Sequence, residues 1–179
     1  IWWRKSRKNG RVTETIERNY LEIKSIDSLK ESALPEIIHS IDLVDPIDFQ
    51  INRFFYKNIG KKHRWTDRLI WSDSDWIKYV SNTKVETYIL KINNDLAGYF
   101  ELIIHTGIKE IEIAYFGLLE EYHNKKFGGY LLSEAIKKSF LKKEIKRVWL
   151  HTCTLDHKNA LNNYLARGMT IYKKETVKI

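Results

Sequence analysis

Three strand-like segments follow one another between Val85 and Leu118, and they constrain the fold more than any other feature of the sequence. Only short turns at 93–95 and near Gly107 separate them, so neighbouring segments are expected to pair in antiparallel fashion. All three are rich in β-branched and aromatic residues: VETYILKI at 85–92, LAGYFELIIH at 96–105 and IKEIEIAYFGL at 108–118. The sequence therefore predicts an antiparallel meander.

The segments on both sides of this meander add helices and further strands. Asp48 has the side chain of an N-cap and Gly60 that of a helix stop, around a segment with one aromatic face. Residues 28–38 also have a helical pattern, although Pro35 interrupts it. The remaining expected elements are strands at 20–23, 147–152 and 170–177 and helices at 72–80, 128–140 and 159–167. Together these elements predict an α/β (α+β) fold.

Composition indicates one domain without disulfide or metal. A chain of 179 residues with 43% hydrophobic content is long enough to bury one core. Residues 1–18 are basic and polar and predict an N-terminal arm ahead of a single domain at 19–179. Cys153 is the only cysteine, which excludes an internal disulfide, and no Cys/His cluster has zinc spacing. No apolar run reaches the length of about 18 residues that a membrane span requires. A cytoplasmic location is expected.

The net charge of +8 raises the possibility of an anionic partner. No nucleic-acid-binding motif accompanies this charge, and the lysines of the helix at 128–140 fall on its polar face. A nucleic-acid-binding module is therefore the disfavoured alternative. Half of the positive excess lies between Glu120 and Arg147, beside the best anion-binding motif of the chain.

That motif is the connection from the third strand to the helix at 128–140, which contains Gly128 and Gly129. A strand that runs into a glycine-containing turn and then a helix directs free backbone N–H groups and the positive helix end at one place. The segment therefore predicts an anion site. A Gly-Gly step at a helix start is equally typical of a simple tight connection.

In this order of elements, the turn resembles the Q/R-x-x-G-x-G/A motif of the GNAT superfamily of N-acetyltransferases. His123, Lys126 and Gly128 occupy its three fixed positions, and only Gly128 matches strictly. If the backbone at Lys126 requires a positive φ, a lysine there is strained.

A second segment, WLHTCTLDHKNALNNYLARGMTIY, is similar to the strand of that family, its N-x-x-A-x-x-x-Y helix and the G-F pair that follows. Ala160, Tyr164 and Gly168 match this pattern, Met169 replaces Phe, and His157 stands where Asn is usual. The resemblance covers residues 85–178 well and the first half only by element order.

The resemblance implies acetyl-CoA as the acyl donor and no metal. The end of the third strand would pair its backbone with the pantetheine arm, and Gly117 would allow close approach. The pyrophosphate would bind at the turn. The implied cofactor-binding residues are Phe116, Gly117, Leu118, His123, Lys125, Lys126, Phe127, Gly128, Gly129, His157 and Tyr164.

Two catalytic residues follow from the same resemblance. EIAYFGL is similar to the strand that carries the general base of histone-type acetyltransferases, which makes Glu112 the first candidate for the base. Glu110 and Glu101 are the alternatives. Tyr164 occupies the position from which the family's tyrosine protonates the departing CoA sulfur. Direct transfer is expected, without Cys153 as a nucleophile.

The acceptor is expected to be the primary amine of a small molecule. Its predicted pocket combines aromatic and guanidinium groups, which favours an acceptor that is neutral or anionic elsewhere. The expected substrate-binding residues are Arg53, Tyr56, Trp65, Arg68 and Trp71. A CoA-binding regulator without catalysis is the alternative within the same fold. The sequence leaves the acceptor, the acyl group beyond acetyl and the oligomeric state open, a homodimer included.

Overall fold

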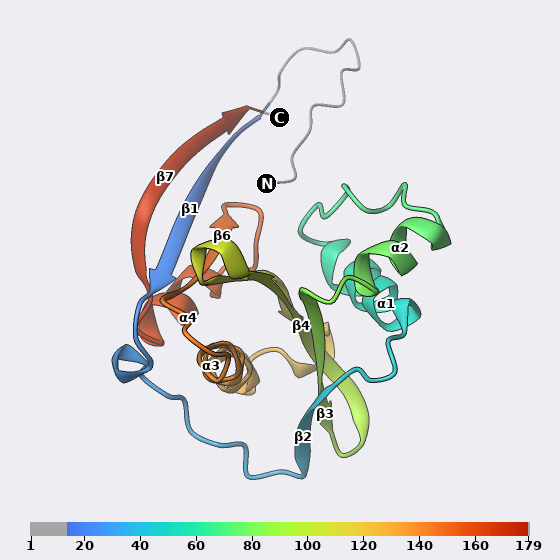
Figure 1. Ribbon diagram of the computed structural model, residues 1–179, viewed down its shortest axis with the longest axis horizontal. Coiled ribbons are helices and arrows are strands. Elements are labelled where there is room, and N and C mark those ends of the chain that lie inside the picture. The colour runs from blue at the N-terminus through green and yellow to red at the C-terminus, as the bar shows by residue number, and fades with distance from the viewer. Residues whose placement is uncertain (1–13, 179) are drawn as a thin grey trace.

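The computed structural model describes residues 14–178, which form one curved sheet with helices on both faces (Figure 1). The strands are β1 (Thr15–Ile23), β2 (His39–Leu43), β3 (Val85–Ile92), β4 (Asp95–His105), β5 (Glu110–Leu118), β6 (Arg147–Cys153) and β7 (Thr170–Lys178). The helices are α1 (Phe49–Gly60), α2 (Asp73–Val80), α3 (Phe127–Phe140) and α4 (Ala160–Ala166). No helix in the described part is long and apolar enough to cross a bilayer.

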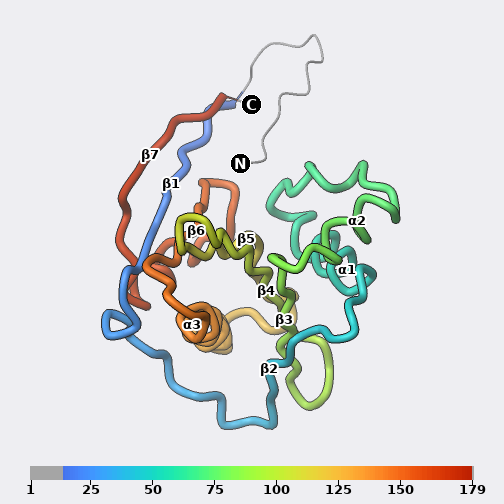
Figure 2. The backbone as a smooth tube through the Cα atoms, in the orientation of Figure 1, coloured from blue at the N-terminus to red at the C-terminus, as the bar shows by residue number. Residues whose placement is uncertain are grey.

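The seven strands lie in the order β2-β3-β4-β5-β6-β1-β7. All neighbours are antiparallel except β5 and β6, which are parallel because the connection between them contains α3. Strand β1 is inserted between β6 and β7, and the backbone trace shows β1 and β7 running side by side (Figure 2). Residues from the start of the chain therefore lie next to the strand that follows α3.

Each face of the sheet has its own hydrophobic core. The sheet curves around α3, whose Leu131, Leu132 and Ile136 are fully buried against residues such as Phe100 and Ile111 (Figure 1). On the opposite face, α1 and α2 cover β3 and β4. A smaller core there consists of Phe55, Ile59, Ile89, Tyr99 and Leu119.

The predicted α/β (α+β) class, the central meander and most helix positions are confirmed. The expected N-cap of α1 is also confirmed, since the Asp48 side chain accepts a hydrogen bond from the amide of Gln50 at 2.9 Å. Helix α2 begins with a capping box between Ser72 and Asp75. These local polar signals are readable from the sequence because they act within one turn.

Two expectations for the first half are corrected. Residues 28–38 form no α-helix: a short 3-10 helix ends at Ser28, and the edge strand β2 begins at His39. Pro35 and the pairing of β2 with β3 outweigh the weak helical pattern. Residues 15–18, which were expected to belong to an N-terminal arm, are part of β1, which begins at Thr15 and pairs on both sides. Residues 1–13 lie outside the described part.

Candidate active site

The parallel strands β5 and β6 separate halfway along their length. They pair only at Glu110–Arg147, Ile111–Val148 and Glu112–Trp149. Beyond this point β5 continues to Leu118, still paired with β4 on its other edge, and β6 continues to Cys153. One edge of β5 from residue 113 onward therefore presents backbone groups that no strand within residues 14–178 uses. An extended, amide-containing ligand can pair with such an edge.

The N-terminus of α3 follows this free edge. The N-cap residue is Lys126, and its side chain makes no capping hydrogen bond among the described residues. The first-turn amides of α3, including those of Gly128 and Gly129, therefore lack a side-chain cap. Uncapped amides together with the positive helix end favour a phosphate group.

Lys126 adopts the left-handed backbone conformation that the glycine of the family motif would favour. Its φ is 65° and its ψ is 8°, and Asn124 in the same turn has φ 59°. The conditional expectation of strain at Lys126 therefore applies, because a side chain makes this conformation unfavourable. The neighbouring Lys125 is not in this region, and its ammonium lies 5.9 Å from the centre of the Tyr122 ring.

The two histidines that replace family residues contact each other. The ring centres of His123 and His157 are 4.7 Å apart in an edge-on arrangement. His123 Nε2 lies 3.0 Å from the carbonyl oxygen of Leu118, and His157 accepts from the amide of Asn159 at 3.1 Å. This pair joins the turn before α3 to the residues that precede the N-terminus of α4. Burial and the neighbouring His123 lower the pKa of His157.

The surroundings of the three glycines in the site differ, so glycine is present at each position for a different structural reason. A side chain at Gly128 would meet its neighbours at ordinary contact distances of 3.6 Å and more, so packing does not require glycine there. At Gly117 a Cβ atom would lie 2.8 Å from Ile59 of α1. Glycine at 117 thus leaves room for the Ile59 side chain of α1. At Gly129 a Cβ would crowd Ser32 and Arg167.

The Phe127 side chain, between Lys126 and Gly128, is buried in the α3 core.

Glu112 is the last residue of β5 that pairs with β6, so it lies where the strands begin to separate. Its side chain is 13% exposed. Its oxygen Oε2 lies 3.1 Å from Nε2 of His105, and this is its one hydrogen bond to a described side chain. The other carboxylate oxygen remains available for a ligand.

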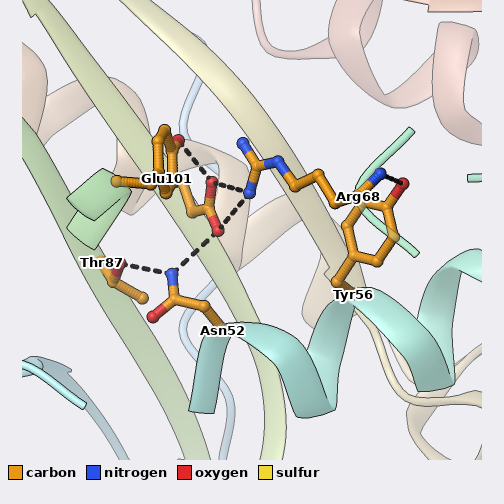
Figure 3. Close-up of polar contacts among 6 residues, drawn as sticks. Asn52, Tyr56, Arg68, Thr87 and Glu101 are labelled. Carbon is orange, nitrogen blue, oxygen red and sulfur yellow. Dashed lines mark hydrogen bonds and ion pairs between the residues drawn. The ribbon is translucent and has the colours of Figure 1, made fainter. Parts of the chain in front are cut away.

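Glu101, by contrast, is completely buried and fully engaged (Figure 3). Its carboxylate accepts hydrogen bonds from Asn52 at 2.8 Å, from Arg68 at 3.0 and 3.2 Å and from Tyr79 at 2.7 Å. Glu110 is also engaged, because Arg147 binds both of its oxygens at 2.9 Å. Neither carboxylate has the freedom that Glu112 has.

Tyr164 lies on the α3 side of the separated strands. It is 7% exposed, and its ring packs against that of Phe116 with 6.2 Å between centres. Burial, followed by the charges of Asp156 and Cys153, raises the pKa of its phenol. The hydroxyl is therefore protonated at neutral pH. The protonated phenol can donate a hydrogen bond to negative charge that develops beside it.

Within residues 14–178, no group of three or more His, Cys, Asp or Glu side chains is arranged to hold a metal ion. Residues 49–169 match the acetyltransferase (GNAT) family. The chain belongs to this family. A comparison with curated proteins finds no match.

Solved GNAT structures have the same fold. The GCN5-related N-acetyltransferase from Sphaerobacter thermophilus gives a TM-score of 0.69 at 12% identity, over 92% of this chain and 51% of that one. The one from Kribbella flavida gives 0.64 at 12% identity, over 90% and 57%. An aminoglycoside acetyltransferase from an uncultured soil metagenomic sample gives 0.59 at 11%, over 72% and 86%. The chain thus spans little more than half of the first two proteins.

Acetyl-CoA, which GNAT enzymes generally use, fits the residues present. The free edge of β5 suits the amides of pantetheine, and the uncapped α3 amides suit the pyrophosphate. Lys125 and Lys126 are exposed beside these amides and add positive charge. Of the expected cofactor-binding residues, Phe116 packs against Tyr164 and His123 against His157, whereas Phe127 is buried in the core.

The expected acceptor residues form a different arrangement from the predicted pocket. Arg68 is 6% exposed, and its guanidinium lies 4.2 Å from the ring centres of both Tyr79 and Tyr115. Tyr56 is buried and accepts from the backbone amide of Arg68 at 3.0 Å (Figure 3). Trp71 lies 4.7 Å from the same guanidinium. Arg68 thus fills an aromatic cage instead of opening one to a ligand.

The other two expected residues lie outside this cage. Arg53 is paired with Asp73 at 2.5 Å at the surface. Trp65 is half-buried, with its ring 4.9 Å from that of Tyr115. Since both Arg53 and Arg68 are paired with carboxylates, these two guanidiniums give no support to the expected preference for an anionic acceptor.

Two residues of the site were not predicted from the sequence. His105 contacts Glu112, and Trp149 contacts His105. Trp149 pairs with Glu112 in register, and its ring is nearly parallel to that of His105 at 6.2 Å. The signal for His105 was available, because the short turn near Gly107 brings the ends of β4 and β5 together and pairs His105 with Glu110.

Proposed function

We propose that the chain transfers the acetyl group of acetyl-CoA directly to the primary amine of a small molecule. The observation that carries this proposal is the separation of β5 from β6, which begins at Glu112 and ends at the uncapped start of α3. A ligand held along this line has its phosphates at α3 and its far end near Glu112. A cytoplasmic location is part of the same proposal.

Glu112 is the base in this proposal because its carboxylate has a free oxygen. Glu101 accepts four hydrogen bonds and is fully buried, and Glu110 is held at both oxygens by Arg147. Hydrogen bonds from charged donors to both oxygens stabilise the ionised form of a carboxylate and make it a weaker base. Of the three candidates, only Glu112 combines partial exposure with an unused oxygen.

The reaction needs one base and one acid. Acetyl-CoA supplies the acetyl group as a thioester. Glu112 takes one proton from the ammonium form of the acceptor, so that the neutral nitrogen can bond to the acetyl carbon. The nitrogen releases its second proton to solvent as the amide forms, and Tyr164 regains a proton from solvent after each turnover. Tyr164 gives its phenolic proton to the sulfur as the carbon–sulfur bond breaks. The indole N–H of Trp149, the residue paired with Glu112, is buried and has no partner among residues 14–178.

A CoA-binding regulator and a nucleic-acid-binding module remain the rival functions. The regulator shares the cofactor site but needs neither Glu112 nor Tyr164. The nucleic-acid module needs the lysines and no cofactor. An assay of turnover, with a Glu112 variant and a matched glutamate control, separates all three.

The test measures free thiol release from acetyl-CoA with amino acids, amino sugars, polyamines and basic peptides as acceptors. Wild type is expected to turn over at least one small amine. Glu112→Gln is expected to lower that turnover by about 10²–10⁴-fold, because one positioned base is lost. Mass spectrometry of the acetylated product confirms that the acceptor nitrogen carries the acetyl group.

The matched control is Glu86→Gln, which removes a carboxylate of β3 that Tyr88 and Lys142 bind and that has no contact with the described residues around Glu112. It is expected to lose far less turnover than Glu112→Gln. Equal losses in the two variants, or wild-type turnover in Glu112→Gln, contradict Glu112 as the base. Acetyl-CoA binding without turnover of any amine supports the regulator instead.

A further inference from the structure

The residues behind Glu112 form an ordered chain of contacts that the acid–base chemistry does not use. Glu112 contacts His105, whose ring lies nearly parallel to that of Trp149, with 20° between their planes. The guanidinium of Arg147 lies 5.9 Å from the centre of the Trp149 ring. Four consecutive partners thus come from the facing ends of three strands, β4, β5 and β6.

Arg147 is itself fixed from two sides. Glu110 binds it through two oxygens, and Glu22 of β1 accepts from Nη1 at 3.0 Å. Such two-pronged pairs hold a guanidinium in one orientation. Because Arg147 is held, the Trp149 ring has a fixed surface beneath it, and His105 has a fixed surface beside it. Glu110, the alternative base candidate, therefore has a structural role in this chain.

In the contact between His105 and Glu112, the histidine is more exposed to solvent than the carboxylate. His105 is 36% exposed and Glu112 is 13% exposed, so the imidazole stands between the carboxylate and solvent. Nε2 faces Oε2 at 3.1 Å, while Nδ1 has no hydrogen-bond partner among the described residues. A ring with its hydrogen on Nε2 donates to the carboxylate and leaves the second oxygen of Glu112 uncommitted.

We infer that His105 is a positioning residue for Glu112: its Nε2–H holds one carboxylate oxygen, so that the other is directed at the acceptor amine. This inference rests on the proposed function of Glu112 as the base. A carboxylate on a flexible side chain rotates about its terminal bond, and a misplacement of about 1 Å can cost about 10²-fold in rate. Trp149 and Arg147 keep the imidazole in place, and the imidazole keeps the carboxylate in place.

Two substitutions at one position separate the hydrogen bond from packing. His105→Gln places an amide N–H close to where Nε2 lies and keeps the donor. His105→Phe keeps an aromatic ring against Trp149 and removes the donor. The assay is thiol release from acetyl-CoA with the small amine that wild type turns over fastest, and it reports kcat and KM separately.

The expected result is a fall of about 10- to 100-fold in kcat for His105→Phe, with His105→Gln recovering most of it. KM for acetyl-CoA should stay within about threefold in both, because neither variant touches the start of α3. His39→Gln on the edge strand β2 is the matched control, since its imidazole packs on Tyr130 far from Glu112. Wild-type kcat in His105→Phe overturns the inference. Equal losses in Gln and Phe also overturn it, because the hydrogen bond would then not be the cause.

A second measurement does not depend on turnover. Nitrogen-15 NMR of the His105 ring identifies which nitrogen carries the hydrogen in the neutral form. The inference predicts hydrogen on Nε2 in wild type and a shift toward the Nδ1-protonated tautomer in Glu112→Ala. Hydrogen on Nδ1 in wild type contradicts it. If wild type acetylates no amine while Nε2 carries the hydrogen, the proposed function fails and the hydrogen bond stands.

Discussion

Arg68 and Glu101 form a buried ion pair in which one guanidinium nitrogen lies 3.0 and 3.2 Å from the two carboxylate oxygens. Asn52 of α1 donates to the same carboxylate (Figure 3). Tyr79 of α2 also donates to it, so Glu101 joins both helices to β4. Burial lowers the pKa of the Arg68 guanidinium, but the nearby charge of Glu101 raises it, and the net result is a raised pKa. The pair fixes the loop between α1 and α2, which carries Trp65 and Asp67.

Breaking this pair should destabilise the fold strongly. Arg68→Met leaves the Glu101 charge buried without a cation, and the expected loss in free energy of unfolding is about 3–5 kcal/mol. The double variant with Glu101→Met should recover part of that loss, since both charges are gone. Urea unfolding of the single and double variants measures this.

The control is Arg53→Met, which breaks the exposed pair with Asp73 and should cost about 0–1 kcal/mol. If Arg68→Met costs no more than Arg53→Met, Arg68 is not the anchor of this loop. Acceptor recognition by a free Arg68 would then be open again.

Lys126 should be replaceable by glycine with a gain in stability. Its left-handed backbone, φ 65°, is unfavourable for a side chain by about 1–2 kcal/mol, and the extra freedom of glycine in the unfolded chain offsets about 0.5–1 kcal/mol of that. The net expected gain for Lys126→Gly is about 0.5–1 kcal/mol by thermal or urea unfolding. Lys125→Gly, at a residue without positive φ, should destabilise. A loss in both variants would show that the turn does not favour glycine at 126.

The sequence predicted the second half of the fold well because its signals are local. Alternation in 85–118, the helix with Leu131 and Leu132 on one face, and the N-cap at Asp48 each depend on neighbours within a few residues. The position of β1 between β6 and β7 depends on pairing between residues over a hundred positions apart. No local pattern carries that information.

The candidate site divides in the same way. The cofactor side was predictable from motifs that follow one turn and one helix, whereas the acceptor side depends on which polar side chains find partners. Arg68 is a residue type that often binds substrates, yet its guanidinium is paired with Glu101, which lies 33 positions later on β4. Glu101 was likewise a candidate base because of its residue type and its position on a strand. The pairing that buries both charges is visible only in three dimensions.

His151 should make the stability of the protein depend on pH. Burial, and then the charge of Arg18, lowers its pKa from 6.5 to about 4. Between these values the unfolded chain takes up a proton that the folded chain does not, so stability falls as the pH drops from 6.5 toward 4. At about 1.4 kcal/mol per pH unit, the contribution at pH 5 is a loss of about 2 kcal/mol.

His151→Gln removes this contribution. Urea unfolding at pH 7.5 and pH 5 should therefore show a smaller loss of stability in His151→Gln than in wild type. His39→Gln, at a half-buried position on β2, should retain the wild-type loss. An unchanged pH dependence in His151→Gln would show that His151 is solvated in the folded protein.

Tyr164→Phe should separate catalysis from packing. The ring contact with Phe116 is kept, while the phenolic proton that is proposed to reach the leaving sulfur is lost. We expect turnover to fall by about 10²-fold and the free energy of unfolding to stay within about 1 kcal/mol. Tyr88→Phe on β3 serves as the matched control, since its hydroxyl bonds Glu86 away from the site. Full turnover in Tyr164→Phe would remove Tyr164 from the mechanism.

The most direct test of the account is isothermal titration of acetyl-CoA into wild type, Gly128→Val and Gly107→Val. Gly107 lies in an open turn with no atom near its missing side chain, so it controls for the glycine-to-valine change itself. The account predicts that wild type and Gly107→Val bind alike and that folded Gly128→Val binds at least about tenfold more weakly, a loss of about 1.4 kcal/mol. Equal affinity in all three proteins, or no binding of acetyl-CoA by wild type, would contradict a cofactor site at the start of α3.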